Sequence, residues 1–476
     1  MPGKSSLLAL IVVVYLILGF LYARLTPPWQ APDEPAHYNF VHYIAANYAL
    51  PELAPGCYDE AYLNHLKSQK FPPDLSIASI CYEHYQPPLY YLLAAPIFGF
   101  SGGDLVALRF FSVVLGAVSL IFVYKTIRLF FPQPALALAT TAFVAFIPMH
   151  LTMLAAVNND ALAELLFILL VYLSLRWLLR EREAGKPFPI IAGVVLGLIL
   201  ITKVTTYISL LLVALILFWG DRTVTGLLKN GLRAYLPALI IALPLYIRNS
   251  LVYGGFDILG LRRHDQVVIR QLRTSDYLAE IGLGAYLNNL FRTIFHSFWG
   301  QFGWLAVPMD SRVYLALSLL QLVVLGGLFL WLWRELPQSR PTRQALWVML
   351  ATIILAVGVF IGLNLSFVQF QGRYFFTALL PLGLFFSLGL FEALKRERAL
   401  GLATVPFVVM VWVGLSSWLG AGLDKWGVLI SGLALVALLI RRWLPVDHAG
   451  WLAAGVYTTL AGLAGASLWW FIIPNL

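Results

Sequence analysis

The chain has 476 residues, of which 60% are hydrophobic and only 12% carry a charged side chain. These are too few charges to cover a soluble protein of this size, so the composition predicts an integral membrane protein. Long apolar runs exclude an outer-membrane barrel, whose strands would alternate in polarity. The net charge of +9 does not indicate nucleic-acid binding, because Lys and Arg fall in short clusters between apolar segments.

The first apolar segment, residues 6–23, follows Lys4 and has no small-x-small cleavage site after it, which is typical of an uncleaved signal anchor. Since about 20 helical residues cross a bilayer, we expect one all-α membrane domain, residues 1–476, with about thirteen spans. The other twelve are expected near residues 105–123, 135–153, 160–178, 189–202, 206–219, 234–252, 313–333, 345–365, 376–393, 402–419, 426–440 and 450–473.

The distribution of positive charge predicts the orientation, because Lys and Arg in short loops mark the cytoplasmic side. With the N-terminus in the cytoplasm, every short basic loop lies inside. The two long loops, residues 24–104 and 253–312, then lie outside, where length exempts the second from the rule. We therefore expect a multi-pass protein of the cytoplasmic membrane, with short helices in two extracytoplasmic loops.

The chain has two cysteines, Cys57 and Cys81, and both lie in the first long loop. Because this topology places the loop in an oxidising compartment, we expect a disulfide between them; two unpaired thiols are the alternative. There is no glycine-rich nucleotide-binding loop, so the sequence requires no soluble nucleotide or other cofactor.

Two adjacent carboxylates, Asp33 and Glu34, lie between prolines in "QAPDEPAHYNF", residues 30–40, just beyond the first span. The structural alternative is a helix start, with Asp33 as the N-cap of an amphipathic helix over residues 36–48 on the bilayer surface. That alternative explains one acid but not the pair.

Other polar residues are expected at the same depth, each with a structural alternative. In "EHYQPPLYY", Gln86, Tyr90 and Tyr91 could belong to an interfacial aromatic belt, and in "NND" Asp160 could cap a helix. Lys203 could snorkel, and the tryptophans of "SFWGQFGW" could lie in the interface. The candidate substrate-binding residues are His37, His84, Gln86, Tyr90, Asn159, Asp160, Lys203, Arg248, Trp299, Gln371, Arg373 and Tyr374.

In this order, the acidic pair, "PPLYY", "NND", "TK" at 202–203 and "GRYFF" resemble the C-type (GT-C) polytopic membrane glycosyltransferase superfamily. That superfamily includes protein O-mannosyltransferases and the lipid A aminoarabinose transferase, and the chain looks closest to a bacterial membrane-protein family related to them. Many members have a histidine directly before the proline pair, whereas here Gln86 takes that place and His84 lies two residues earlier.

The resemblance implies transfer of a sugar from a polyprenyl-phosphate donor to a hydroxyl of a lipid, glycan or protein at the extracytoplasmic face, with inversion. It implies that Asp33 is the general base and that Glu34 orients the acceptor or supports Asp33. Arg373 would stabilise the charge on the leaving phosphate, supplemented by Lys203, with Arg248, Arg262 and Arg263 as weaker candidates.

A divalent metal is possible, because Glu34 and His37 have E-x-x-H spacing and Asp33 precedes them. We expect the bilayer, the lipid donor and the acceptor as partners, and no nucleic acid. The alternative function is a transporter or flippase of lipid-linked glycans, whose ionisable residues would concentrate at the membrane midplane. A third reading is a scaffold without activity. The enzyme requires Asp33, Gln86, Asp160 and Arg373 to line one cavity open to the outer leaflet.

Overall fold

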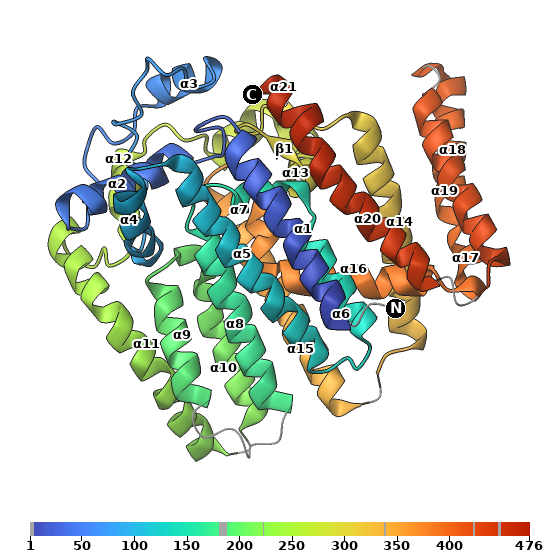
Figure 1. Ribbon diagram of the computed structural model, residues 1–476, viewed down its shortest axis with the longest axis horizontal. Coiled ribbons are helices and arrows are strands. Elements are labelled where there is room, and N and C mark those ends of the chain that lie inside the picture. The colour runs from blue at the N-terminus through green and yellow to red at the C-terminus, as the bar shows by residue number, and fades with distance from the viewer. Residues whose placement is uncertain (1–3, 180–187, 222, 338, 422–423, 446–448) are drawn as a thin grey trace.

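The computed structural model describes residues 4–179, 188–221, 223–337, 339–421, 424–445 and 449–476 (Figure 1). The described residues are mostly helical, with one two-stranded hairpin, which confirms the predicted all-α membrane fold. The helices run mostly side by side, α1 begins at its lower end, and the C-terminus lies at the top (Figure 1).

Ten helices or helix combinations in the described part of the chain are long and apolar enough to cross a membrane. Their elements are α1 (Lys4–Leu25), α5 (Leu105–Arg128), α8 (Asp160–Leu179), α11 (Val224–Tyr253), α14 (Ser311–Arg334), α15 (Arg340–Ser366), η2 (Gly372–Ala378) with α16 (Leu379–Ala393), α17 (Arg396–Leu402) with α18 (Thr404–Ser416) and η3 (Ser417–Ala421), α19 (Lys425–Trp443), and α20 (Ala449–Ser467) with η5 (Leu468–Ile472) and α21 (Ile473–Asn475).

The apolar helix predicted over residues 135–153 is present, but it is not continuous. The structure breaks it into α6 (Pro134–Ala145) and α7 (Pro148–Leu154), which are bent by 66°. Pro148 explains the break, because its ring clashes with the carbonyl of residue i−4 and it has no N–H to donate. Counting this pair as one span gives eleven.

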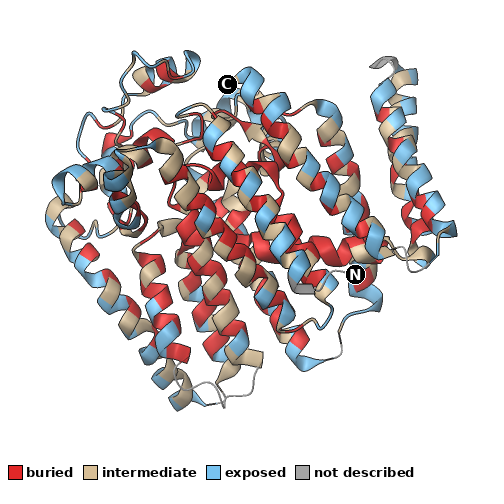
Figure 2. Cartoon of the chain, in the orientation of Figure 1, coloured by how far each residue is buried: buried red, intermediate tan, exposed pale blue. Residues whose placement is uncertain are grey.

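Two further predicted spans correspond to helices that are short for a full crossing: α9 (Phe188–Leu200), and η1 (Val204–Tyr207) with α10 (Ile208–Gly220). The predicted count of thirteen is therefore not confirmed, although every predicted span coincides with helix in the described residues. Buried residues concentrate where α5, α6, α8 and α16 meet in the middle of the bundle (Figure 2).

The two long connecting segments form an outer layer at one end of the bundle, at the top of Figure 1, which we call the loop end. The first contains α2 (Glu34–Asn47), α3 (Glu60–Ser68) and the apolar α4 (Leu89–Ser101). The second contains α12 (Leu261–Val267), α13 (Thr274–Trp299) and a hairpin of β1 (Gln301–Phe302) and β2 (Val307–Pro308).

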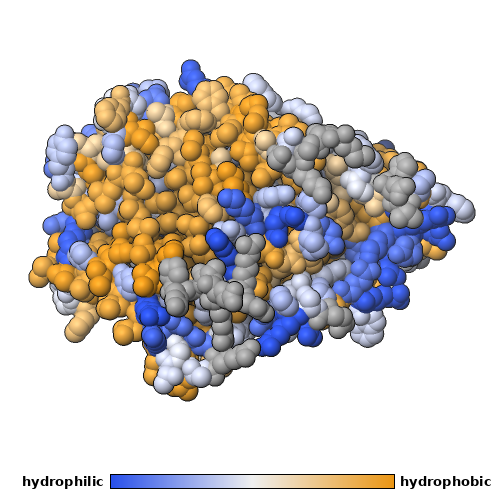
Figure 3. Space-filling view, turned by 60° about the horizontal axis from the view of Figure 1, so that its bottom comes forward, coloured by the Kyte–Doolittle hydropathy of each residue, from blue (hydrophilic) through white to orange (hydrophobic). Residues whose placement is uncertain are grey.

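The opposite end of the molecule comes forward in Figure 3, where hydrophilic side chains gather below an apolar wall. Exposed basic residues stand in the last turns of several helices: Lys125 and Arg128 of α5, Arg176 of α8, Arg334 of α14, and Arg442 of α19. Such residues favour the contact of a helix end with water and phospholipid headgroups.

Two ties hold the loop end together. Cys57 and Cys81 form a disulfide, and the backbone N–H of Cys81 donates to the carbonyl of Cys57 at 3.0 Å. The indole N–H of Trp304, in the hairpin, donates to the Trp29 carbonyl at 3.0 Å, which joins the second segment to the first. Trp304, the tryptophan of "FGW", therefore links the second long segment to the first.

Reduction of this disulfide is expected to loosen residues between α2 and α4 without unfolding the bundle. The cysteines are 24 residues apart, and closing a loop of this size stabilises it by about 3 kcal/mol. Non-reducing mass mapping should find the Cys57 and Cys81 peptides joined, and limited proteolysis after reduction should cut first between them. Alkylation of both thiols without a reductant would contradict the expectation.

Candidate functional site

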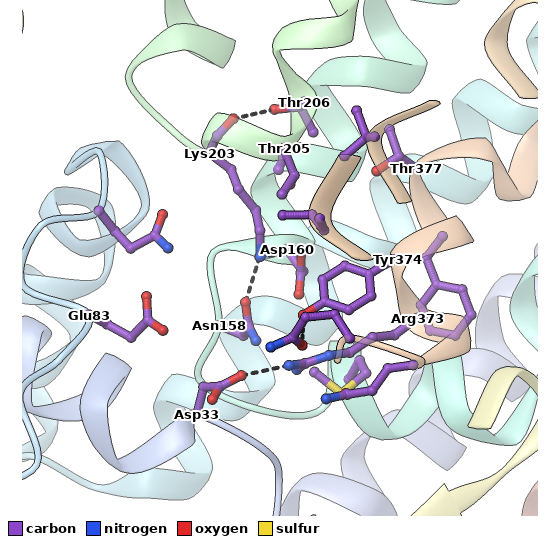
Figure 4. Close-up of a pocket in the computed structure, with 18 of the residues that line it drawn as sticks. Asp33, Glu83, Asn158, Asp160, Lys203, Thr205, Thr206, Arg373, Tyr374 and Thr377 are labelled. Atoms are coloured by element: carbon purple, nitrogen blue, oxygen red, sulfur yellow. Dashed lines mark hydrogen bonds and ion pairs between the residues drawn. The ribbon is translucent and has the colours of Figure 1, made fainter. Parts of the chain in front are cut away.

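A polar cavity of about 380 Å³ lies at the loop end of the bundle. Its walls come from the start of α2, the segment before α4, the α7–α8 connection, the α9–η1 connection, α12, α15 and η2 (Figure 4). All four residues that the enzyme hypothesis requires in one cavity line it. Among the predicted site residues, the cavity contains Asp33, His37, Gln86, Asp160, Lys203, Gln371, Arg373 and Tyr374.

Asp33 precedes α2 in the left-handed region, with φ of 68°, and its side chain makes no capping hydrogen bond. Asp33 therefore occupies the predicted N-cap position of α2, but its side chain does not cap the helix. A non-glycine residue in this region is uncommon, although Asp tolerates it better than most. The unusual backbone directs the carboxylate into the cavity instead of back toward the helix (Figure 4).

The Asp33 carboxylate has a cation on one oxygen and a hydroxyl on the other. Arg373 Nη2 donates to Oδ2 at 2.7 Å, and the Tyr82 hydroxyl donates to Oδ1 at 2.8 Å. Burial raises the pKa of Asp33, but the charges of Arg373 and His37 and the hydrogen bonds from Arg373 and Tyr82 together outweigh burial and hold this pKa below its usual value. Asp33 is thus ionised at neutral pH, with both oxygens hydrogen-bonded.

Glu34 points away from the cavity and is completely buried. Arg109 of α5 donates to both of its oxygens, from Nε to Oε1 at 2.7 Å and from Nη2 to Oε2 at 2.6 Å. The backbone N–H groups of Trp29 and Val157 complete the carboxylate's contacts. Arg109 also donates to the carbonyls of Ala23, Thr26 and Pro27. Glu34 therefore fixes the exit of α1 and does not touch the cavity.

A second ion pair crosses the cavity wall. Lys203 Nζ lies 2.6 Å from Asp160 Oδ1 and donates to Asn159 Oδ1 at 3.1 Å. The N–H of Asp160 is satisfied by Asn158 Oδ1 at 2.9 Å, so Asn158 performs the capping role that Asp160 was a candidate for. Lys203 accordingly pairs with an acid in the site rather than only snorkelling.

Asn159 and Tyr90 lie behind the wall rather than in it. The Asn159 side-chain amide donates to the Thr202 carbonyl at 3.1 Å and to Gln86 Oε1 at 3.4 Å. The Tyr90 hydroxyl contacts Ser112 Oγ at 2.7 Å. Both residues support the cavity's backbone and are not among its lining side chains.

Three other predicted site residues have structural positions away from the cavity. The His84 ring packs edge-on against Phe40, with ring centroids 5.5 Å apart. Arg248 donates to the carbonyls of Leu50 and Pro51, and Trp299 is buried in the central core. Of the weaker candidates, Arg263 Nε donates to the Leu53 carbonyl at 2.9 Å and neither Arg262 nor Arg263 lines the cavity.

The residues considered for a metal do not converge. Glu34 is committed to Arg109, and the ring of His37 pairs through Nδ1 with the Tyr91 hydroxyl at 2.7 Å. In the described part of the chain, the one group of possible ligands close enough together is Cys57, Cys81 and His84. Its two sulfurs are joined in the disulfide and are not thiolate ligands.

Sequence reasoning missed several residues of the cavity. Tyr82 and Glu83 lie just after Cys81 and line the cavity. The sequence feature that could have identified them is the charge of Glu83, four positions before the proline pair. A buried His150–Glu164 pair, with Nε2 to Oε2 at 2.8 Å, forms part of the wall inside the bundle. The sequence feature that could have identified this pair is Pro148, because the helix breaks there and His150 of α7 then contacts Glu164 of α8.

The sequence model of the dolichyl-phosphate-mannose-protein mannosyltransferase family matches residues 85–249. No curated protein sequence matches the chain. Residues 85–249 include Gln86, Asp160 and Lys203, so the match covers three of the predicted site residues that line the cavity.

Solved structures resemble almost the whole chain. ArnT from Cupriavidus metallidurans bound to undecaprenyl phosphate is 14% identical, with a TM-score of 0.53, over 98% of this chain and 78% of that chain. The oligosaccharyltransferase of Archaeoglobus fulgidus in its apo form is 14% identical, with a TM-score of 0.50, over 93% of this chain and 56% of that chain. At this identity the likeness concerns the fold.

Proposed function

From its shared fold and its relationship to the C-type glycosyltransferases, we propose that the chain is a membrane glycosyltransferase that moves a sugar from a polyprenyl-phosphate donor to a hydroxyl acceptor. The observation that carries the proposal is the cavity, in which Asp33, Gln86, Asp160 and Arg373 meet from four separate segments. Such a convergence of charged groups in one pocket is the usual mark of a reaction site.

The cations in the cavity suit a phosphate leaving group. Arg373 and Lys203 both line it, each held by a carboxylate, Asp33 and Asp160 respectively. Side-chain cations aimed at the place where charge develops lower the barrier to its departure. The similar ArnT structure contains undecaprenyl phosphate, which supports a lipid phosphate as the donor here.

In the proposed reaction, the acceptor oxygen attacks the anomeric carbon of the sugar and loses its proton to a carboxylate in the cavity. The bond from that carbon to the phosphate oxygen breaks, and its electron pair leaves with the lipid phosphate. A single displacement inverts the anomeric centre. The acceptor is a hydroxyl of a lipid, glycan or protein, and the reaction is assigned to the extracytoplasmic face, with the N-terminus in the cytoplasm.

The proposal is tested with purified protein and a panel of polyprenyl phosphate sugars. We expect release of polyprenyl phosphate with at least one sugar, accelerated by a hydroxyl acceptor and absent from protein-free micelles. In reconstituted vesicles, movement of the labelled lipid between leaflets without any sugar release would instead identify a flippase. Neither release nor movement with any donor would contradict both functions.

A further inference from the structure

Glu83 is a buried carboxylate on the cavity wall with no role in the reaction as proposed so far. It lies between the disulfide and the proline pair, and its side chain points toward the space beside Asp33 and Asn158 (Figure 4). The residue is only 9% exposed, and its Oε2 has no hydrogen-bond partner within the described parts of the chain.

A buried carboxylate with one oxygen left without a partner is costly, so such a group is rarely retained for folding alone. The neighbouring backbone is well fixed: Cys81 is held by the disulfide, the Tyr82 hydroxyl donates to Asp33, and the N–H of Gln86 donates to the Glu83 carbonyl at 2.9 Å. Glu83 is therefore held at the cavity with one oxygen available.

Asp33 has the opposite environment. One oxygen accepts from Arg373 and the other from Tyr82, so a proton arriving at Asp33 would neutralise the partner of Arg373 and weaken that ion pair. Where two carboxylates share a site, the one left without a cation is the better proton acceptor, and the one paired with a cation stays ionised.

We infer that Glu83 accepts the proton of the attacking hydroxyl and that Asp33 is a positioning residue that holds Arg373 toward the leaving phosphate. The inference rests on the proposed glycosyl transfer and reassigns the base that the resemblance implied. The acceptor O–H bond breaks and its proton passes to Glu83. The oxygen forms the new bond to the anomeric carbon, and the lipid phosphate leaves with the electron pair of the broken bond.

The electrostatics of the cavity agree with this assignment. Burial and the negative charge of Asp33 raise the pKa of Glu83 to about 7, against the lowering influence of Gln86, Lys203 and Arg373. A base with such a pKa is half ionised near neutral pH and binds a proton strongly enough to take it from a hydroxyl. Only the ionised form acts, so the rate should rise with pH through this value.

Other titratable groups surround Glu83 on every side. They are Tyr82, His84 and Tyr85 in its own segment, Asp33 and His37 at α2, Tyr91 of α4, Asp160 of α8, Lys203 before η1, His264 and Asp265 of α12, and Arg373 and Tyr374 of η2. Burial lowers the pKa of His37 to about 3 and that of His84 to about 4, which removes both from the neutral range. His264 needs its own control.

The test is the pH dependence of kcat/KM for polyprenyl phosphate release. The wild type should lose about tenfold per pH unit on the acid side of a midpoint near 7. Glu83→Gln should be slower by about 100- to 10,000-fold and should lose the acid limb, which is the fall in kcat/KM with decreasing pH. Glu83→Asp should keep an acid limb. His264→Gln should keep the limb of the wild type.

Asp33→Asn is the discriminating variant. Because the Asp33 charge raises the pKa of Glu83, the variant should be slower but retain an acid limb, displaced to lower pH. An Asp33→Asn protein that loses the limb, or a Glu83→Gln protein that keeps it, would overturn the assignment. Release by the wild type is measured first, so failure of glycosyl transfer itself is recognised separately. Thermal unfolding and disulfide mapping of each variant identify any that misfold.

Discussion

Replacing Arg373 by glutamine is expected to lower kcat for polyprenyl phosphate release by about 100- to 1,000-fold, the usual effect of removing one group that stabilises charge in a transition state. Its guanidinium lies 2.7 Å from Asp33 and lines the cavity, so it faces the site where the phosphate would leave. Arg373→Lys keeps the charge but loses the planar, paired geometry, so its kcat should lie between those of the wild type and Arg373→Gln.

The readout is kcat and KM measured separately at saturating acceptor. A matched control is Arg312→Gln, since Arg312 also pairs with an aspartate, Asp310, at 2.6 Å but is 48% exposed and does not line the cavity. That variant should behave as the wild type. Wild-type kcat in Arg373→Gln would remove Arg373 from the proposed mechanism.

Glu34→Gln is expected to destabilise the protein by about 3–5 kcal/mol, because removing one partner of a buried ion pair leaves the other charge uncompensated. Arg109 is as buried as Glu34, and it also holds the backbone where α1 ends. This effect is on folding, whereas the resemblance assigned Glu34 to the reaction.

Unfolding in denaturant measures the effect, with Glu335→Gln as the control. Glu335 also belongs to an ion pair, with Lys395, but is 40% exposed, so its loss should change stability by less than about 1 kcal/mol. A Glu34→Gln protein as stable as the wild type would contradict the structural role.

The sequence predicted which residues meet at the cavity better than it predicted their individual roles. Eight candidates reach it because alternating spans bring every second connection to the same end of the bundle. Asp33 and Glu34 could not be told apart, because they are adjacent and similar in chemistry. Their different positions, Asp33 in the cavity and Glu34 away from it, follow from the left-handed backbone at Asp33 and from Arg109, 75 residues from Glu34. No local spacing encodes the contact between Arg109 and Glu34.

The broken helix shows the same limit for the fold. Hydropathy predicts a span over residues 135–153 because α6 and α7 are both apolar. The 66° bend depends on Pro148 and on a partner for the freed backbone, which His150 provides by pairing through Nδ1 with the Val144 carbonyl at 2.8 Å. Whether a membrane proline bends a helix depends on such partners, which periodicity does not contain.

The sequence separation within the two ion pairs sets an order of assembly during synthesis. Glu34 can meet Arg109 once α5 has entered the membrane, but Asp33 must wait for Arg373, 340 residues further along the chain. At about 5–20 residues/s, that interval lasts roughly 20–70 s. A nascent or truncated chain that ends before η2 would therefore anchor, form its disulfide and fix its first loop, yet leave Asp33 without its cation. The candidate site is completed only when nearly four fifths of the chain has been made.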